Sequence, residues 1–342
     1  MSAVVRTPID DPAAWRGEDL AVRDDWVISF DPPLIAELDA ALDEVEARGI
    51  DALDIRKEDF PLPGISSMRE SILGALEGGL GFVLLRGMPV ARWNEARSRR
   101  ALYGLGTHLG WAEPQDGAGN RLHDVRDIGR EFGSDDNIRY FQTSHSISFH
   151  NDGADMFALC CLHAGRSGGL SRLVSAVELF NEIARRRPDL AEVLQQPFHF
   201  DARGQHPNGD RCQVIPIYSF ERDAISIISK SEYIYSAQRF DDVPRLSAAQ
   251  QEALELLKSI PEEPGMTLEF YLQPGDTLIA SNHVALHGRT AFTDEPSSAP
   301  PRHMLRLWLT IPNGRPLPPH YADTREFRYT WQRRMSAQPN SS

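Results

Sequence analysis

The chain has 342 residues, of which 41% are hydrophobic and 25% are charged, and its formal net charge is −13. A chain of this length and composition can bury a large core, in one elaborated domain or in two small ones. The negative charge repels polyanions and provides no basic surface for nucleic acid, so we expect no nucleic-acid partner.

The first residues, Met1 to Pro8, lack the apolar core of a signal peptide, and no stretch of about 18 apolar residues could cross a membrane. We therefore expect a cytoplasmic protein without a membrane partner. Cys160 and Cys161 are adjacent in an apolar run and Cys212 stands alone. This indicates free thiols, with neither a disulfide framework nor a cysteine zinc site. Nothing in the sequence specifies the oligomeric state.

The chain begins with a polar, Pro-containing stretch at residues 1–30, where we expect a loosely ordered arm. Residues 31–320 are expected to form a single domain with a helical N-terminal portion, and residues 321–342 a C-terminal tail. Helical spacing of apolar residues predicts helices in the first part of the domain. Their expected ranges are 32–49, 66–77 and 92–108, with a buried strand at 81–87.

A polar, Gly-rich stretch follows at 110–130 and could be a lid or a surface connector. Many short apolar runs separated by turn residues then predict strands. The expected strands are 138–142, 156–162, 172–176, 198–203, 213–220, 224–229, 266–272, 277–280 and 304–311. Helices are expected at 177–187, before Pro188, and at 247–259, where Ser247 and Gln250 suit a capping box. The pattern predicts a mainly β fold with decorating helices, a double-stranded β-helix or jelly roll.

The chemistry is expected where Phe149-His150-Asn151-Asp152 ends an apparent strand. Residues i and i+2 of an extended chain point to the same side, so His150 and Asp152 can reach one metal ion. A second imidazole would complete the two-His, one-carboxylate face that holds non-haem Fe(II). His199 and Asp201 repeat the spacing, but His199 lacks the apolar run and Gly-rich turn that follow His150. We interpret His199 as a strand residue.

Three histidines late in the chain could supply the second imidazole, namely His283, His287 and His303. His283 and His287 share one face of a strand, so periodicity does not choose between them. Arg302 and Arg306 are four residues apart and also share a face. A guanidinium group is a permanently charged, planar donor that suits a carboxylate.

Four motifs in this order resemble those of the Fe(II)/2-oxoglutarate dioxygenases of the taurine dioxygenase (TauD/TfdA) family, over about residues 81–318. They are FHND at 149–152, SGGLS at 167–171, NHVALHGRT at 282–290 and RHMLRLW at 302–308. The resemblance implies a jelly roll in which His150, Asp152 and His287 hold the iron.

The resemblance also implies a binding site for 2-oxoglutarate. Arg302 would hold its distal carboxylate, and Ser171 would support a carboxylate of the co-substrate or be a simple turn residue. Arg306 would hold the 1-carboxylate of 2-oxoglutarate or an anionic group of the substrate. The long stretch between His287 and Arg302 departs from the family pattern, so the two arginines could exchange roles.

The activity implied by the resemblance converts 2-oxoglutarate and O₂ to succinate and CO₂ at Fe(II) and hydroxylates an unactivated C–H bond. The expected substrate is a small anionic molecule such as an amino acid, carboxylate or sulfonate. The intact Asp152 disfavours halogenation, whereas desaturation or cyclisation remains an alternative. Two other classes share the ligands: a non-catalytic jelly-roll binding protein and a zinc hydrolase. The segment 201–216, with Arg203 and Arg211, could fold over an anion or be a solvated hairpin tip.

Overall fold

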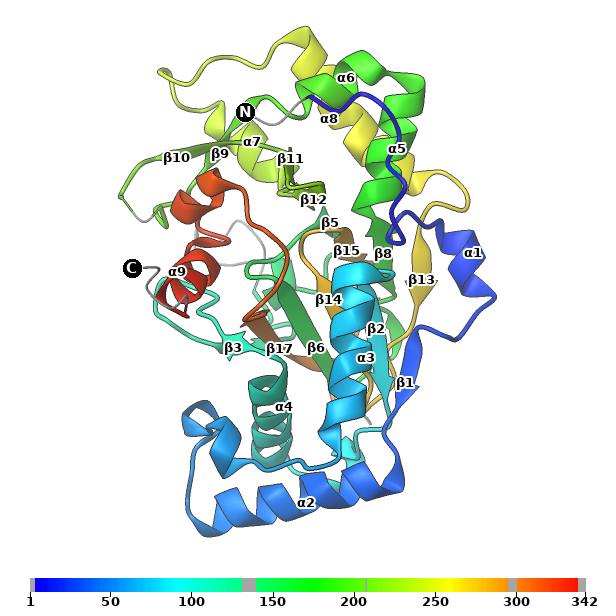
Figure 1. The fold of residues 1–342 in the computed structure, drawn as a ribbon, viewed down its shortest axis with the longest axis vertical. Helices are drawn as coiled ribbons and strands as arrows, with labels where there is room; N and C mark the ends of the chain where they lie inside the picture. The colour runs from blue at the N-terminus through cyan, green and yellow to red at the C-terminus, as the bar shows by residue number, and fades with distance from the viewer. Residues whose placement is uncertain (1–3, 131–139, 207, 295–299, 338–342) are drawn as a thin grey trace.

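The computed structural model describes residues 4–130, 140–206, 208–294 and 300–337. Two sheets face each other across a shared apolar layer (Figure 1). The larger sheet has the order β1-β2-β14-β6-β17-β3, with β4 also paired to β17. Its strands are β1 Val27–Ser29, β2 Phe82–Arg86, β3 Trp111–Ala112, β4 Leu122–Val125, β6 Met156–His163, β14 Thr277–Ser281 and β17 His303–Thr310.

The smaller sheet has the order β13-β8-β15-β5. Its strands are β5 Ile147–His150, β8 Ser171–Ser175, β13 Leu268–Phe270 and β15 Ala285–Arg289. Three strand pairs extend this frame: β7 Ser167–Gly168 with β16 Phe292–Thr293, β9 Pro197–Asp201 with β10 Cys212–Pro216, and β11 Tyr218–Glu221 with β12 Ala224–Ile227. The architecture is the predicted double-stranded β-helix.

The larger sheet is buried on both faces because its side chains alternate between two apolar layers. On β2, Val83 and Leu85 pack against the helices, whereas Phe82 and Leu84 pack toward the smaller sheet. On β17, Leu305, Leu307 and Leu309 join the helical layer. Strand alternation therefore points Arg302, Met304, Arg306 and Trp308 inward, toward the smaller sheet.

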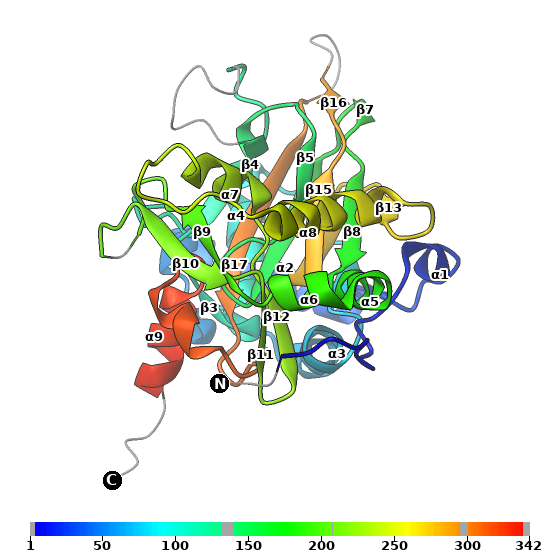
Figure 2. The ribbon, with the colours of Figure 1, turned by 90° about the horizontal axis from the view of Figure 1, so that it is seen from above.

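Helices α2 Pro32–Ala47, α3 Ile65–Gly78 and α4 Glu95–Leu109 cover the outer face of the larger sheet (Figure 1). Helices α5 Ala176–Arg186, α6 Pro188–Val193 and α8 Ala248–Ser259 pack against one another beside the smaller sheet (Figure 2). The remaining helices are α1 Gly17–Ala21, α7 Ser231–Ala237 and α9 Arg328–Ala337. Short 3₁₀ turns lie at η1 Ala52–Asp54, η2 Lys57–Asp59, η3 Val90–Arg92, η4 Tyr140–Gln142, η5 Ile260–Glu262 and η6 Pro319–Asp323.

The two ends of the described chain differ from the expected arm and tail. Trp15 and Leu20 are buried between the sheets, and the Trp15 indole donates a hydrogen bond to the carbonyl of Leu80 at 2.7 Å. At the other end, Tyr321 and Phe327 are fully buried and their rings stack at 4.6 Å. Scattered aromatic residues without a regular period supply this burial, which is why periodicity did not reveal it.

Several expected elements have different bounds. Residues 140–142 form a 3₁₀ turn, and the start of the strand expected at 138–142 lies outside the described residues. The strand expected at 213–220 is divided between β10 and β11. Pro188 begins α6 as well as ending α5, because its fixed φ suits the first turn of a helix. The stretch 110–130 contributes β3 and β4 to the larger sheet.

None of the helices in the described part of the chain is long and apolar enough to cross a bilayer.

Replacing Trp15 with alanine tests whether the N-terminal residues belong to the core. The change removes a large buried side chain and its hydrogen bond to Leu80, so we expect the free energy of unfolding to fall by about 3–5 kcal/mol. Val22→Ala is the control because Val22 is 86% exposed and should change little. Equal urea midpoints for both variants would contradict the integration of this segment.

Candidate active site

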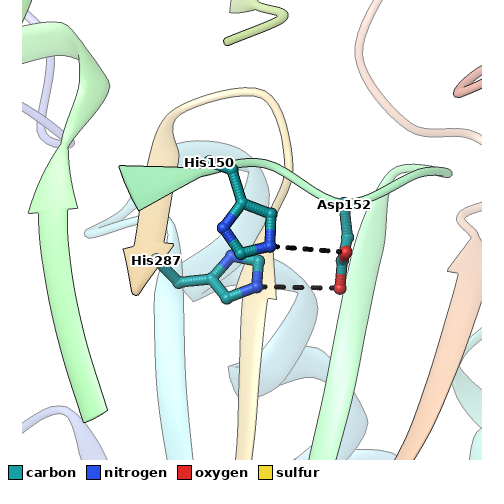
Figure 3. A group of neighbouring side chains, drawn as sticks. All are labelled: His150, Asp152 and His287. Carbon is teal, nitrogen blue, oxygen red and sulfur yellow. Dashed lines mark ion pairs between the residues drawn. The ribbon is translucent and has the colours of Figure 1, made fainter. Parts of the chain in front are cut away.

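Strand pairing brings His150 and His287 together although they lie far apart in the sequence. The two residues are partners in the antiparallel register of β5 and β15, and their ring centroids are 4.3 Å apart. Asp152 follows β5 by two residues and turns its carboxylate toward both rings (Figure 3). The Nε2 atoms of His150 and His287 lie 3.8 and 3.7 Å from the two Asp152 oxygens. One potential ligand atom from each of His150, Asp152 and His287 lies within 4.8 Å of the other two.

Hydrogen bonds to the backbone fix the orientation of these side chains. The Nδ1 atom of His150 lies 2.9 Å from the Ser148 carbonyl, which can only accept, so Nδ1 donates and Nε2 keeps its lone pair for a metal. The side-chain oxygen Oδ1 of Asn282 accepts a hydrogen bond from the backbone amide of Asp152 at 3.0 Å. The side-chain nitrogen Nδ2 of Asn282 donates to the carbonyl of Gly153 at 2.7 Å. Asn282 thus holds the turn that carries Asp152.

The electrostatics of the cluster favour metal binding. Burial lowers the pKa of both imidazoles, so His150 and His287 are neutral near pH 7. Burial alone would raise the pKa of Asp152, but the charge of the neighbouring Arg306 lowers it well below its usual range. Neutral imidazoles and an ionised carboxylate are the forms that bind a metal ion. The donor set therefore fits the two-His, one-carboxylate face for Fe(II).

The other candidate histidines have different partners. His283 is fully buried between Asp155, 2.9 Å from its Nε2, and Ser226, 3.1 Å from its Nδ1, and burial lowers its pKa to about 4. His303 faces the opposite side of β17 and its Nε2 lies 2.8 Å from Asp124, which also binds Arg99. His199 is a residue of β9, opposite Val214 of β10. Of the three late histidines, the structure brings only His287 to His150 and Asp152.

Arg306 lies next to the proposed ligands. Its Nη1 donates to both oxygens of Asp152, at 3.1 and 3.0 Å, and its Nε donates to Gln115 at 2.8 Å. Gln115 in turn donates to the Arg306 carbonyl at 2.8 Å. The stretch 110–130 therefore helps to position Arg306. The sequence reading missed Gln115, because no local pattern links it to β17.

Arg302 occupies a second, deeper position, where it is 2% exposed. Its guanidinium and that of Arg289 lie over the ring of Phe292, at 5.1 and 4.6 Å from the centroid. Burial, and then the charge of Arg302, lower the pKa of Arg289 to about 9. Among the described residues, Nη1 of Arg302 and both Nε and Nη1 of Arg289 have no hydrogen-bond partner. Two buried cations with free donors fit a carboxylate ligand.

Ser171 lies close to this pair in the sheet. It is the register partner of Arg289 across β8 and β15, and it is buried. Asp294 and Asp127 supply some compensating charge to Arg289. Arg289 was not predicted as a site residue. The signal was present, because Arg289 follows His287 by two residues and so shares its face of the strand.

Comparison with known proteins agrees with the fold and the geometry. A double-stranded β-helix that carries two imidazoles and a carboxylate defines the class of non-haem iron, 2-oxoglutarate-dependent dioxygenases, and this protein is such an enzyme. Residues 46–308 match the family model described as "Taurine catabolism dioxygenase TauD, TfdA family", and the chain belongs to that family.

Individual similarities extend beyond the family model. FR-33289 synthase from Streptomyces rubellomurinus is 28% identical over 349 residues, covering 99% of each chain. A uridine-5'-phosphate dioxygenase from a Streptomyces species is 27% identical, covering 64% of this chain and 81% of the relative. The crystal structure of an asparagine oxygenase with Fe(II), 2S,3S-3-hydroxyasparagine and succinate has a TM-score of 0.62 at 18% identity, covering 83% and 94% of the two chains.

These findings confirm several predictions from the sequence. The family, the jelly-roll fold and the enzyme class are as expected, and Fe(II), 2-oxoglutarate and O₂ are the cofactor and co-substrates of the class. Structural neighbours bind small molecules, namely hydroxyasparagine in the asparagine oxygenase and dihydroxy-L-Arg in the non-haem iron oxygenase OrfP. The roles of individual residues remain predictions.

Replacing Asn282 with alanine tests the support of the Asp152 turn. Loss of the hydrogen bonds to the Asp152 amide and the Gly153 carbonyl should loosen the carboxylate and weaken metal binding by about 10–100-fold. Anaerobic titration with Fe(II), or with Co(II) as a spectroscopic substitute, measures the affinity. Asn208→Ala changes an exposed asparagine and is the control. Unchanged affinity in the Asn282 variant would show that the turn needs no such support.

Proposed function

We propose that the enzyme hydroxylates an unactivated C–H bond of a small anionic organic molecule while 2-oxoglutarate and O₂ become succinate and CO₂. The observation that carries this proposal is the convergence of His150, His287 and Asp152 beside buried arginines that have free donors. A zinc hydrolase with the same ligands has no use for those arginines.

In this proposal His150, Asp152 and His287 hold Fe(II) on one face and leave the opposite positions open. When bound with 2-oxoglutarate and O₂, the iron supplies the oxidising power that removes a hydrogen atom from the substrate. The protein's own residues orient the reactants and exclude water. Phe157 contributes to this, because its ring lies 4.2 Å from that of His287 and keeps one side of the imidazole dry.

Arg302 is proposed to bind the distal carboxylate of 2-oxoglutarate, with Ser171 as a hydroxyl donor. Support comes from the buried Nη1 of Arg302, which has no partner among the described residues. We add Arg289 to this site, because its free donors lie over the same Phe292 ring. Arg289 also donates to the Thr143 carbonyl at 2.8 Å, which holds its guanidinium in place.

Arg306 is proposed to bind the 1-carboxylate of 2-oxoglutarate or an anionic group of the substrate. Its contact with Asp152 supports a role close to the metal, whereas Arg302 is paired with Arg289. We therefore propose that Arg302 binds the distal carboxylate of 2-oxoglutarate, and that Arg306 binds its 1-carboxylate or an anionic group of the substrate.

An anionic substrate is also consistent with the relatives. A uridine 5'-phosphate carries a phosphate group, and asparagine carries a carboxylate. We propose that the substrate carries an anionic group such as a phosphate or a carboxylate, and that the enzyme acts in the cytoplasm. Desaturation or cyclisation by the same hydrogen abstraction is a second outcome, which product analysis by mass spectrometry distinguishes from hydroxylation.

The Asp152→Ala variant tests the metal ligand. Loss of the only carboxylate of the proposed triad should abolish substrate-stimulated succinate formation in a screen of small acids. The same variant should lose the visible charge-transfer band that the wild type gives with Fe(II) and 2-oxoglutarate without O₂. Full activity would remove Asp152 from the site. A wild type without the band would instead favour a protein that binds ligands without turnover.

The Arg302→Lys variant tests the co-substrate site. Lysine keeps the charge but cannot make two parallel hydrogen bonds to a carboxylate, so the KM for 2-oxoglutarate should rise about tenfold. Affinity for Fe(II) alone should stay the same. Arg211→Lys is the control, because Arg211 is exposed and paired with Asp242 at 2.6 Å. A normal KM for 2-oxoglutarate would assign the distal carboxylate to another residue.

A further inference from the structure

A buried ion pair lies beside the proposed metal ligands and takes no part in the roles described above. The ammonium group of Lys230 lies 3.0 Å from a carboxylate oxygen of Glu326, and their side chains are 12% and 1% exposed. Gln213 donates to the other Glu326 oxygen at 2.8 Å. Removing two charges from water is costly, so such a pair needs a structural or functional reason.

The backbone connects this pair directly to the turn that carries Asp152. The amide of Ser229, next to Lys230, donates to the side chain of Asn151 at 2.8 Å. The amide of Ala154 donates to the carbonyl of Glu326 at 2.8 Å. Lys230 and Glu326 are therefore fixed on either side of the turn.

Positive charge exceeds negative charge around the pair. The cationic groups of Lys230, Arg203 and Arg325 lie 5.9, 6.0 and 5.2 Å from the ring centroid of Tyr233. Glu326 forms ion pairs with both Lys230 and Arg325, at 3.0 and 3.4 Å. Glu232 lies near Arg203, so the three cations face two carboxylates. We call Lys230, Arg203 and Arg325 with Tyr233 the cationic cluster.

The cluster is built to hold its cations in place. Gln213 accepts from the Arg325 amide at 3.1 Å, and Asp201 accepts from the Arg203 amide at 2.9 Å. Among the described residues, the buried Nη1 of Arg325 has no hydrogen-bond partner. Arg325 also pairs with Glu326 through its Nε, at 3.4 Å. The Nη1 that remains is a buried charged donor, which indicates a site for an anion.

We propose that the cationic cluster binds an oxyanion group of the substrate and thereby sets which C–H bond faces the iron. This rests on the proposed function for the site as a whole. The ligand class is a phosphate monoester, sulfonate or carboxylate, all of which accept charge-assisted hydrogen bonds from Lys and Arg. Arg325 and Glu326 lie beyond residues 46–308, which match the family model. Lys230, Arg203 and Tyr233 lie within that range, so the cluster joins this C-terminal segment to the part of the chain that matches the family model.

The test uses the full-length protein loaded with Fe(II) and saturating 2-oxoglutarate without O₂. Inorganic phosphate, sulfate and acetate are titrated separately by calorimetry, so that the preferred oxyanion is identified. Lys230→Gln removes one cation and leaves Glu326 paired with Arg325, whose Nε lies 3.4 Å from it. Arg325→Gln removes the second cation. Arg211→Gln, in the same hairpin but paired with Asp242, is the matched control.

We expect at least one anion to bind the wild type and to lose about tenfold in affinity in Lys230→Gln and in Arg325→Gln, but not in Arg211→Gln. The charge-transfer band of bound Fe(II) and 2-oxoglutarate should be unchanged in every variant. Anion affinities equal to the wild type in both cluster variants, or no anion binding to a wild type that shows the band, would overturn the proposal. A wild type without the band would instead overturn the proposed function, whatever the anion titration gives.

Discussion

The site depends on the antiparallel pairing of β5 with β15. This pairing places His150 opposite His287 across more than a hundred residues of sequence. Neither imidazole could approach the other without a fold that returns a late strand beside an early one, and the double-stranded β-helix does so. The loop-closure entropy of that long connection is offset by the buried layers on both faces of the larger sheet. The packing that stabilises the core therefore also sets the geometry of the metal ligands.

The second constraint is charge. Asp152 is surrounded by cations, with Arg306 in contact and Lys230 further away. A buried carboxylate that stays ionised needs such neighbours, since burial by itself favours the protonated form. Arg302 and Arg289 differ from Asp152, because they are buried cations and some of their donors, Nη1 of Arg302 and Nε and Nη1 of Arg289, have no partner among the described residues. Arg302 and Arg289 therefore place positive charge in this part of the interior although the whole molecule is strongly acidic. Their charge suits dianionic 2-oxoglutarate.

Much of the fold and the metal cluster could be predicted from the sequence. Alternation in β17 put Arg302 and Arg306 on one face, and the i, i+2 rule paired His150 with Asp152. The helical spacing of apolar residues predicted helices α2, α3 and α4. The choice of His287 over His283 was different, because both share one strand face and only the family resemblance favoured His287. Burial of His283 against Asp155 could not be read from spacing, since Asp155 belongs to another element.

The positions that escaped prediction have one property in common, which is that tertiary contacts define them. Gln115 meets Arg306, and Gln213 meets Glu326, across long sequence separations and without a local pattern. Trp15 and Phe327 are isolated aromatic residues in polar stretches. The composition of these stretches therefore predicted a loosely ordered arm and a tail, whereas both side chains are buried in the core. Arg289 is the exception, since the spacing used for His150 and Asp152 would have found it.

The hydrogen bond from Ala154 to Glu326 also has a consequence for truncated forms of the enzyme. A variant cut before residue 326 would keep all three proposed iron ligands but would lose the backbone acceptor of the Ala154 amide, two residues after Asp152. The segment around Glu326 thus contributes to the geometry of a site whose proposed ligands all precede it.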